Sequence, residues 1–290
     1  MKNMKKFYII ANSDKDKDLV VTHELEEYLK SKEVAYHIHV ITPKEDAGNA
    51  RFTNEDEIDD DTDCIIVTGG DGTLIQASRD IRDKNIPLIG INLGYLGYLT
   101  EIEKEDIQKD IDMLLDGNYT LESRIMLNGS VYRDGKLVFE DISLNDIVVG
   151  RAESLRIVDF KMYVDGEFLN LYSADGVIVS TPTGSTAYNL SAGGPILEPK
   201  TNIVAITPIC SHTLNNRSVV ISADSDVDVV ICPGRHLSGN NTVAYFDGNS
   251  TFLLKENDVL KIRKSKLTTK FVRIHNKSFI EILHSKMDRA

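Results

Sequence analysis

The sequence is poor in several features that would assign a protein to a class at once. Its 290 residues contain no Trp, three Cys and seven Pro. Cys64, Cys210 and Cys232 are scattered and show no CxxC spacing, which argues against a disulfide framework or a zinc site and favours a reducing cytosol. No apolar run is long enough to cross a bilayer, and the run from Phe7 to Ala11 is too short for a signal peptide. We therefore expect a cytoplasmic protein with no membrane partner.

Basic residues are also in deficit. The chain has 33 Lys and Arg against 45 Asp and Glu, which gives a formal net charge of −12. Because no basic stripe is present to neutralise phosphates, nucleic acid is not an expected partner. If such an acidic protein binds phosphorylated ligands, the attraction must come from backbone N–H groups, helix N-termini and metal ions.

The first 119 residues alternate strand and helix patterns. Short apolar runs such as "KFYIIAN", "CIIVT" and "IPLIGIN" predict buried strands, and segments such as "DLVVTHELEEYLKSK" have the apolar spacing of helices. Apolar strands separated by helices imply a parallel sheet that is covered on both faces. We expect residues 1–119 to form a Rossmann-like α/β domain.

After Tyr119 strand patterns follow one another. Asp-Gly pairs at 134–135, 165–166 and 247–248 predict hairpins between them. Residues 120–270 are therefore expected to form a mainly β sandwich. The last segment, 271–290, has the pattern of a strand followed by a short helix that packs back on the protein.

The stretch "IIVTGGDGTLIQA" at residues 65–77 places an aspartate among three glycines, directly after a buried strand and before a helix. Open α/β sheets bind ligands at this edge. Glycines at 69, 70 and 72 carry no Cβ, so the backbone can take positive φ and approach a phosphate closely, and a helix that starts near Thr73 would offer free N–H groups. A structural turn is the alternative, because Asp and Gly dominate turns. The loop is neither a Walker A motif nor GxGxxG.

Two further stretches favour function over a plain turn. "LNDIVV" pairs Asn145 with Asp146 at the start of an apolar strand, and "SADGVIVSTPTGSTAYNLSAGGPIL" spans residues 173–197. Together with GGDGT they resemble the bacterial NAD kinase family, in the same order, from about Lys6 to Asn249. GGDGT is shared with phosphofructokinases and lipid kinases. The long run at 175–196 and "PICSHTLNNRSVV" are much more specific.

The resemblance implies transfer of the γ-phosphoryl group of ATP, with Mg²⁺, to the 2′-hydroxyl of the adenosine ribose of NAD. It implies that Asp71 is the general base, which agrees with the ability of a carboxylate to take a proton from a ribose hydroxyl. It assigns no metal-ligating residue. The dinucleotide contacts that it implies are Gly72, Asn145, Asp146, Arg156, Asp175, Thr186, Ala187, Tyr188, Asn189, Leu190, Ser191 and Asn249.

Several of these residues have alternative interpretations. Asn249 follows a hairpin turn, and Arg156 could be an ordinary exposed strand residue. Ser185 or Thr186 could cap a helix. Many relatives have a basic residue where this chain has Gln76 and another at position 173, which is serine here, so the phosphate donor stays open between ATP and polyphosphate.

Two other functions stay open at this stage. One is a lipid or other hydroxyl kinase of the same superfamily, although no polybasic or amphipathic stretch suggests a membrane surface. The other is a non-catalytic dinucleotide-binding module. The resemblance also implies a homodimer or homotetramer, and the exposed strand edges of a sandwich give a physical reason for one.

Overall fold

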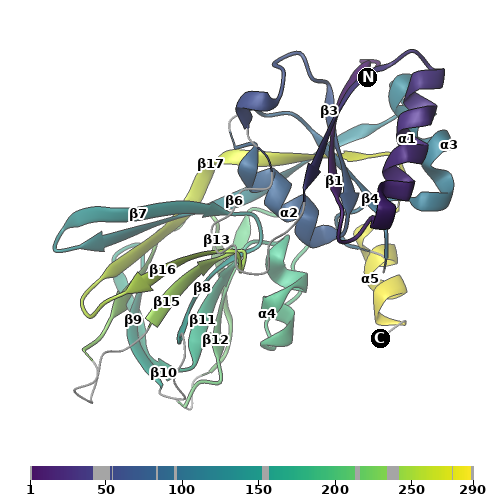
Figure 1. Cartoon of the computed structure of the whole chain (residues 1–290). Coiled ribbons are helices and arrows are strands. Elements are labelled where there is room, and N and C mark those ends of the chain that lie inside the picture. Colours follow the sequence, from purple (N-terminus) through teal and green to yellow (C-terminus); the bar gives the residue numbers. More distant parts are fainter. Residues whose placement is uncertain are drawn as a thin grey trace. The chain divides into compact units, whose positions relative to one another are not determined.

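The computed structural model describes residues 2–41, 53, 55–82, 84–94, 97–151, 157–212, 216–233, 242–275 and 277–288. The chain forms two compact units. One takes in Met1–Ala47, Arg51–Arg124 and Thr269–Ala290, and the other takes in Ile125–Thr268. The chain passes from one unit to the other within two long strands, β6 (Thr120–Arg133) and β17 (Val259–Arg273). Figure 1 shows both units coloured along the chain.

The first unit is built on a parallel sheet, as the sequence predicts. Its strands lie in the order β2-β1-β3-β4, with β5 and the end of β17 paired to β4. The strands are β1 (Lys6–Asn12), β2 (Ala35–Ile41), β3 (Cys64–Gly69), β4 (Leu88–Asn92) and β5 (Ile102–Glu103). The helices are α1 (Val20–Ser31), α2 (Asp71–Asp80), α3 (Ile107–Leu115) and α5 (Phe279–Met287), with 3-10 turns η1 (Lys17–Leu19), η2 (Glu55–Glu57) and η3 (Lys104–Asp106).

Helices cover this sheet on both sides. The strands β3 and β4 are buried along their whole length, as expected when both faces are covered. In Figure 1, α1 and α3 lie on one side of the strands and α2 lies on the other. Leu25 and Leu29 of α1 and Ile111 of α3 pack with Phe7 and Ile66 in one apolar cluster. Gly117, with φ of 75°, ends the α3 segment, where glycine is the residue that helix ends prefer.

The C-terminal segment is a strand followed by a helix, as predicted. Phe271 of β17 pairs with Leu88 of β4, and α5 begins at a capping box in which Ser278 and Glu281 satisfy each other's backbone N–H groups.

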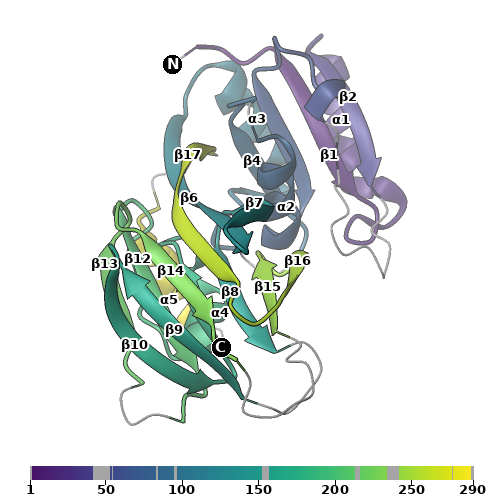
Figure 2. The ribbon, with the colours of Figure 1, turned by 90° about the vertical axis from the view of Figure 1, so that its left-hand side faces the viewer.

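The second unit contains two sheets of mainly antiparallel strands. One has the order β10-β9-β14-β17, and the hairpin of β6 and β7 joins this sheet because β6 pairs with β17. The other has the order β13-β12-β11-β8-β15-β16. Figure 2 shows β10, β9 and β14 side by side. The bounds are β7 (Lys136–Ser143), β8 (Asp146–Arg151), β9 (Val158–Val164), β10 (Glu167–Ala174), β11 (Gly176–Ser180), β12 (Ile203–Ile209), β13 (Val219–Ser222), β14 (Val227–Ile231), β15 (Thr242–Phe246) and β16 (Ser250–Leu254), with η4 (Gly184–Thr186) and α4 (Tyr188–Ser191).

Inward-facing side chains of the two sheets share one core. Phe160 and Met162 of β9 pack in the same cluster as Val149 of β8 and Val177 of β11. This arrangement is the sandwich that the strand pattern predicts. Among the described residues, no helix is long and apolar enough to cross a membrane.

All three Asp-Gly pairs form the predicted hairpin turns. Asp134, Asp165 and Asp247 each have φ of 51°, and the glycine after each has φ between 73° and 81°. Two consecutive residues with positive φ are what a type I′ turn requires, and Asp-Gly is one of the pairs that tolerate it.

Candidate active site

Asp71 lies at the carboxyl edge of the parallel sheet, where the chain order of the strands changes direction between β1 and β3. This switch point is the position where open α/β sheets bind ligands. Asn12, the last residue of β1, donates a hydrogen bond to the Thr73 hydroxyl at 2.9 Å and ties the end of β1 to the start of α2. Asp71 is the first residue of α2, and its side chain is half-buried.

Three backbone N–H groups hold the Asp71 carboxylate. Tyr98 donates to Oδ2 at 2.7 Å, and Leu99 and Thr100 donate to Oδ1 at 3.2 Å each. A carboxylate offers about four lone-pair positions, so these bonds leave room for roughly one more donor. The carboxylate is therefore fixed in orientation and can still accept one hydrogen bond from a ligand hydroxyl.

Gly97 makes this arrangement possible, and it is not among the residues predicted from the sequence. A Cβ at position 97 would lie 1.9 Å from Asp71 Oδ1 and 2.4 Å from the Thr100 hydroxyl oxygen. The signal in the sequence was a second glycine-containing stretch, "GYLGYLT", after β4, because the ends of parallel strands meet at one edge of the sheet.

The GGDG glycines do not use the positive φ that glycine allows. None of Gly69, Gly70 and Gly72 has φ in the left-handed region, and Gly70 is extended, with φ of −109° and ψ of −176°. The reason is that α2 begins at Asp71 and not near Thr73, so Gly72 already lies in the first helical turn. Glycine serves here by its small size. A Cβ at 69 would meet the Thr73 side chain at 2.7 Å, whereas nothing lies within 4 Å of a Cβ at 70 or 72, which leaves the start of the helix open to a ligand.

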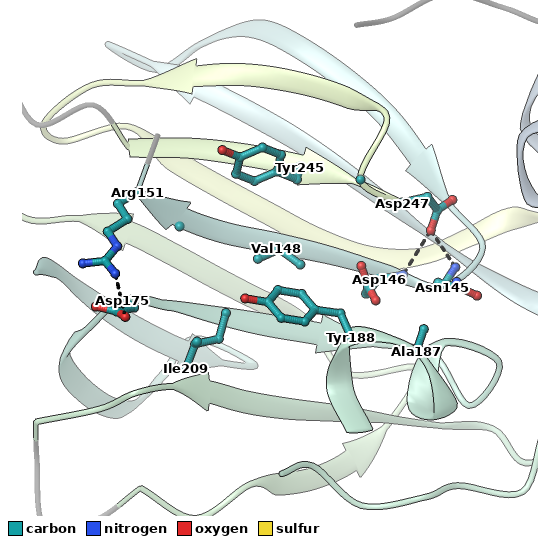
Figure 3. Close-up of a pocket in the computed structure, with 12 residues that line it drawn as sticks. Asn145, Asp146, Val148, Arg151, Asp175, Ala187, Tyr188, Ile209, Tyr245 and Asp247 are labelled. Carbon is teal, nitrogen blue, oxygen red and sulfur yellow. Dashed lines mark hydrogen bonds and ion pairs between the residues drawn. The ribbon is translucent and has the colours of Figure 1, made fainter. Parts of the chain in front are cut away.

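The second unit contains a pocket of about 550 Å³. Figure 3 shows its lining, which comes from β8, β15, α4, the end of β12 and the turn after β15. The lining residues are Asn145, Asp146, Val148, Gly150, Arg151, Asp175, Ala187, Tyr188, Ile209, Tyr245, Asp247 and Gly248. Five of them were predicted from the sequence, namely Asn145, Asp146, Asp175, Ala187 and Tyr188.

Asp247 organises one end of this pocket. Its carboxylate accepts the backbone N–H groups of Leu144, Asn145 and Asp146 at 2.8, 2.7 and 3.1 Å. From the sequence, Asp247 is only the first residue of a predicted hairpin turn. In addition to that role, it fixes the backbone that presents Asn145 and Asp146.

Asp146 is 5% exposed, and its carboxyl group lies in the pocket. Burial and, to a smaller extent, the negative charge of Asp247 together raise the pKa of this carboxyl to about 7. Near neutral pH, a substantial fraction of the protein therefore carries Asp146 in its uncharged form.

An ion pair closes the other end of the pocket. Arg151 Nη2 lies 3.1 Å from Asp175 Oδ2. Between this pair and Asp146, the ring of Tyr188 lies along the pocket, with Val148 and Tyr245 beside it (Figure 3). The pocket thus combines two polar ends with an aromatic and apolar middle, which suits a ligand with a flat ring and several hydrogen-bonding groups.

The segment 183–194 is held to the sandwich by buried polar contacts. Asn189 is fully buried, donates to the carbonyl oxygens of Ser185 and Pro195 at 3.2 and 2.9 Å, and accepts from the Thr207 hydroxyl at 2.7 Å. A Cβ at position 184 would lie 2.2 Å from the Asn145 carbonyl oxygen, so only glycine allows this approach. These contacts place Ala187 and Tyr188 at the pocket.

The helix-cap interpretation of Ser185 and Thr186 is wrong. Their hydroxyls donate to the carbonyl oxygens of Pro182 and Thr183, at 2.6 and 3.4 Å, and neither η4 nor α4 has a side-chain cap. Thr186 is partly exposed and does not line the pocket.

The other predicted contacts lie elsewhere. Leu190, Ser191 and Asn249 are exposed and outside the pocket lining, and Asn249 belongs to the turn between β15 and β16. Arg156 lies outside the described residues. Gly72 belongs to the first unit, beside Asp71. Their contacts with a dinucleotide stay predictions.

Gln76, which replaces a basic residue of many relatives, is buried and donates to Asp80 Oδ1 at 2.7 Å. No group of three or more His, Cys, Asp or Glu side chains that could hold a metal ion is found in the described part of the chain. The described residues therefore do not form a set of protein ligands that would enclose Mg²⁺. Mg²⁺ commonly binds mainly to substrate phosphates and water, and that mode needs no such set of ligands.

Comparison with known proteins finds a matching family model for each part of the chain. A model of the ATP-NAD kinase N-terminal domain matches residues 7–119, and a model of the ATP-NAD kinase C-terminal domain matches residues 144–274. The chain is 42% identical to an NAD kinase of Lachnospira eligens over 293 residues, covering 98% of this chain and all of that protein. It is 41% identical to an NAD kinase of Agathobacter rectalis, covering 98% of this chain and 99% of the relative.

Solved structures share the fold. A yeast NADH kinase in complex with NADH has a TM-score of 0.86 at 22% identity, covering 99% of this chain and 88% of the yeast chain. An NAD kinase from Archaeoglobus fulgidus in complex with ATP has a TM-score of 0.77 at 23% identity, covering 98% and 99% of the two chains. The matches over both domains and nearly the full length show that this chain belongs to the ATP-NAD kinase family.

Proposed function

We propose that this protein is an NAD kinase that transfers the γ-phosphoryl group of ATP to the 2′-hydroxyl of the adenosine ribose of NAD, and that Asp71 is its general base. The observation that carries the proposal is the Asp71 carboxylate itself, which three backbone N–H groups orient and which retains one position for a donor. Family membership supports the reaction, and the geometry around the Asp71 carboxylate supports its role as the base.

The chemical step forms one P–O bond, breaks another and transfers one proton. As the ribose oxygen forms its bond to the γ-phosphorus, its proton passes to Asp71, and the bond from that phosphorus to the bridging oxygen of ADP breaks. The products are NADP and ADP. The open N-terminus of α2 beside Gly70 and Gly72 suits the phosphate groups, because its N–H groups and dipole favour negative charge.

The pocket of the second unit is the proposed place of the dinucleotide. Asn145 and Asp146 offer hydrogen-bonding groups at one end, and Tyr188 offers an aromatic face for a base. We assign Mg²⁺ to the phosphate groups of ATP and no residue of the chain to Mg²⁺, since the described residues contain no cluster that would hold it.

The test is NADP formation from NAD, ATP and Mg²⁺ by the purified protein and by Asp71→Asn. The asparagine keeps the size of the side chain but cannot take the proton, so we expect a loss of roughly 10²–10⁴-fold in kcat. Binding of NAD should change little. An unmutated protein that binds NAD without making NADP would contradict the proposal and favour a non-catalytic dinucleotide-binding module. Phosphorylation of a lipid in place of NAD would favour a lipid kinase of the same superfamily.

Assembly and location are part of the same proposal. We expect a cytoplasmic homodimer or homotetramer. All three cysteines are free, in line with a reducing compartment, and the edge strands β10 and β16 carry exposed Phe168 and Leu253. Light scattering at micromolar concentration tests the assembly, and a stable monomer would contradict it.

A further inference from the structure

Asp146 carries a buried carboxyl group that pairs with no other side chain among the described residues. Only 5% of the residue is exposed, and its side chain lines the pocket (Figure 3). Its backbone N–H donates to Asp247, but its carboxyl oxygens have no hydrogen bond or ion pair to any described residue. A buried polar group that the protein leaves unpaired and that lines a pocket is available to a ligand.

The charges around the pocket do not favour an ionised Asp146. On the turn after β15, Asp247 accepts three N–H groups, so its negative charge has its own partners. At the end of β8, Arg151 faces Asp175 at the far end of the pocket. Of the described residues, the other titratable groups that line the pocket are Tyr188 on α4 and Tyr245 on β15, and Cys210, after β12, acts on Tyr188 from nearby. None of these groups places a cation beside Asp146.

The uncharged form has a capacity that the charged form lacks. An ionised carboxylate can only accept hydrogen bonds, whereas a carboxylic acid carries an O–H donor. Burial and the neighbouring charge of Asp247 raise the pKa of Asp146 to about 7, so the acid form is well populated near neutral pH.

We propose that Asp146 binds the dinucleotide as a neutral carboxylic acid and donates its O–H to an acceptor atom of the adenosine, a ring nitrogen or a ribose oxygen. This inference rests on the proposed function, because it names the protonation state in which the same pocket takes NAD. No bond other than a hydrogen bond forms. Asp146 is a binding residue here, and the proton that it holds is separate from the one that Asp71 receives.

The proposal predicts a direction for the effect of pH. Below about pH 7 the free protein already holds the proton, so NAD binds without proton uptake. Above it, each binding event must draw a proton from solution, and the Kd should rise, approaching tenfold per pH unit.

Calorimetry of the full-length protein with NAD, without ATP, measures this directly. Titrations at pH 6.5 and pH 8.5, each in two buffers of different ionisation enthalpy, give the number of protons taken up. We expect an uptake of roughly 0.2 proton at the lower pH and close to one at the higher pH. An uptake near zero at both values, or proton release, overturns the proposal. Failure of NAD to bind at either pH would instead overturn the proposed function.

Two variants test which carboxyl group takes up the proton when NAD binds. Asp146→Asn keeps the shape and a donor but cannot titrate, so its Kd should vary by less than about threefold between the two pH values, with no uptake. Asp175→Asn removes the other predicted carboxylate of the pocket and should keep the proton uptake of the parent, whatever its affinity. Uptake that persists in Asp146→Asn, or that disappears only in Asp175→Asn, contradicts the assignment. The parent titration decides the outcome even if a variant does not fold.

Discussion

Gly97 gives the sharpest structural test of how Asp71 is held. In Gly97→Ala the new Cβ would lie 1.9 Å from Asp71 Oδ1 and 2.4 Å from the Thr100 hydroxyl oxygen. Because non-bonded atoms do not approach so closely, either the carboxylate or the segment 97–100 must move by about 1 Å or more. A movement of about 1 Å in a reacting group can reduce the rate by roughly 10²-fold.

We therefore expect Gly97→Ala to lose about 10²-fold in kcat for NADP formation. The Kd of NAD should stay within about threefold of the parent value, because the pocket of the second unit is unchanged. Steady-state kinetics with saturating NAD and ATP, together with NAD titration, separate the two effects.

The control is Gly94→Ala in the same segment. Nothing lies within 4 Å of a Cβ at position 94, so this variant should keep the activity of the parent. Thermal unfolding of both variants checks that the fold is retained. A Gly97→Ala enzyme with kcat within threefold of the parent would refute the reasoning, because the carboxylate could then move without consequence.

Three further predictions concern the second unit. Asp247→Asn removes the carboxylate that accepts three backbone N–H groups, while Asn still tolerates the positive φ at this position. The free energy of unfolding measured in urea should therefore fall by about 2–4 kcal/mol. An unchanged free energy of unfolding would contradict the role of the carboxylate. Gly184→Ala places a Cβ 2.2 Å from the Asn145 carbonyl oxygen, so the Kd of NAD, measured by titration, should rise at least tenfold. An unchanged Kd would show that NAD binding does not need the close contact between residues 184 and 145. Asp146 has a folded pKa raised from 3.8 to about 7, so its contribution to stability is present below pH 3.8 and is lost as the pH rises to 7. Relative to the parent, Asp146→Asn should therefore gain stability over that range, by on the order of 4 kcal/mol in urea unfolding at pH 8, whereas a constant difference at all pH values would contradict the buried, unpaired state.

Local patterns predicted most of the fold because they depend on neighbouring residues only. Apolar runs such as Cys64–Thr68 become the buried strand β3, and each Asp-Gly pair forms its turn, since both follow from the side chains present at the position. The start of α2 was placed two residues late, because Asp71 and Gly72 are poor helix formers and Asp71 is held by amides of a distant segment.

The site was harder to predict, because its residues meet only through tertiary contacts. Asp247 is about 100 residues from the backbone that it holds, and Gly97 is 26 positions from Asp71, so neither role has a local pattern. Asp71, Asn145 and Asp146 were identified through their motifs. Nothing in the sequence indicates that Asp146 is buried with no partner for its carboxyl group among the residues that the structure describes.

The central claim is that Asp71 accepts the proton of the ribose 2′-hydroxyl. A crystal structure of the protein with NAD and a non-hydrolysable ATP analogue tests it most directly. We expect the 2′-oxygen at about 2.6–3.2 Å from an Asp71 carboxylate oxygen, with the hydrogen bonds from residues 98–100 retained. A 2′-hydroxyl bound out of reach of Asp71, with no water molecule linking the two, would contradict the account.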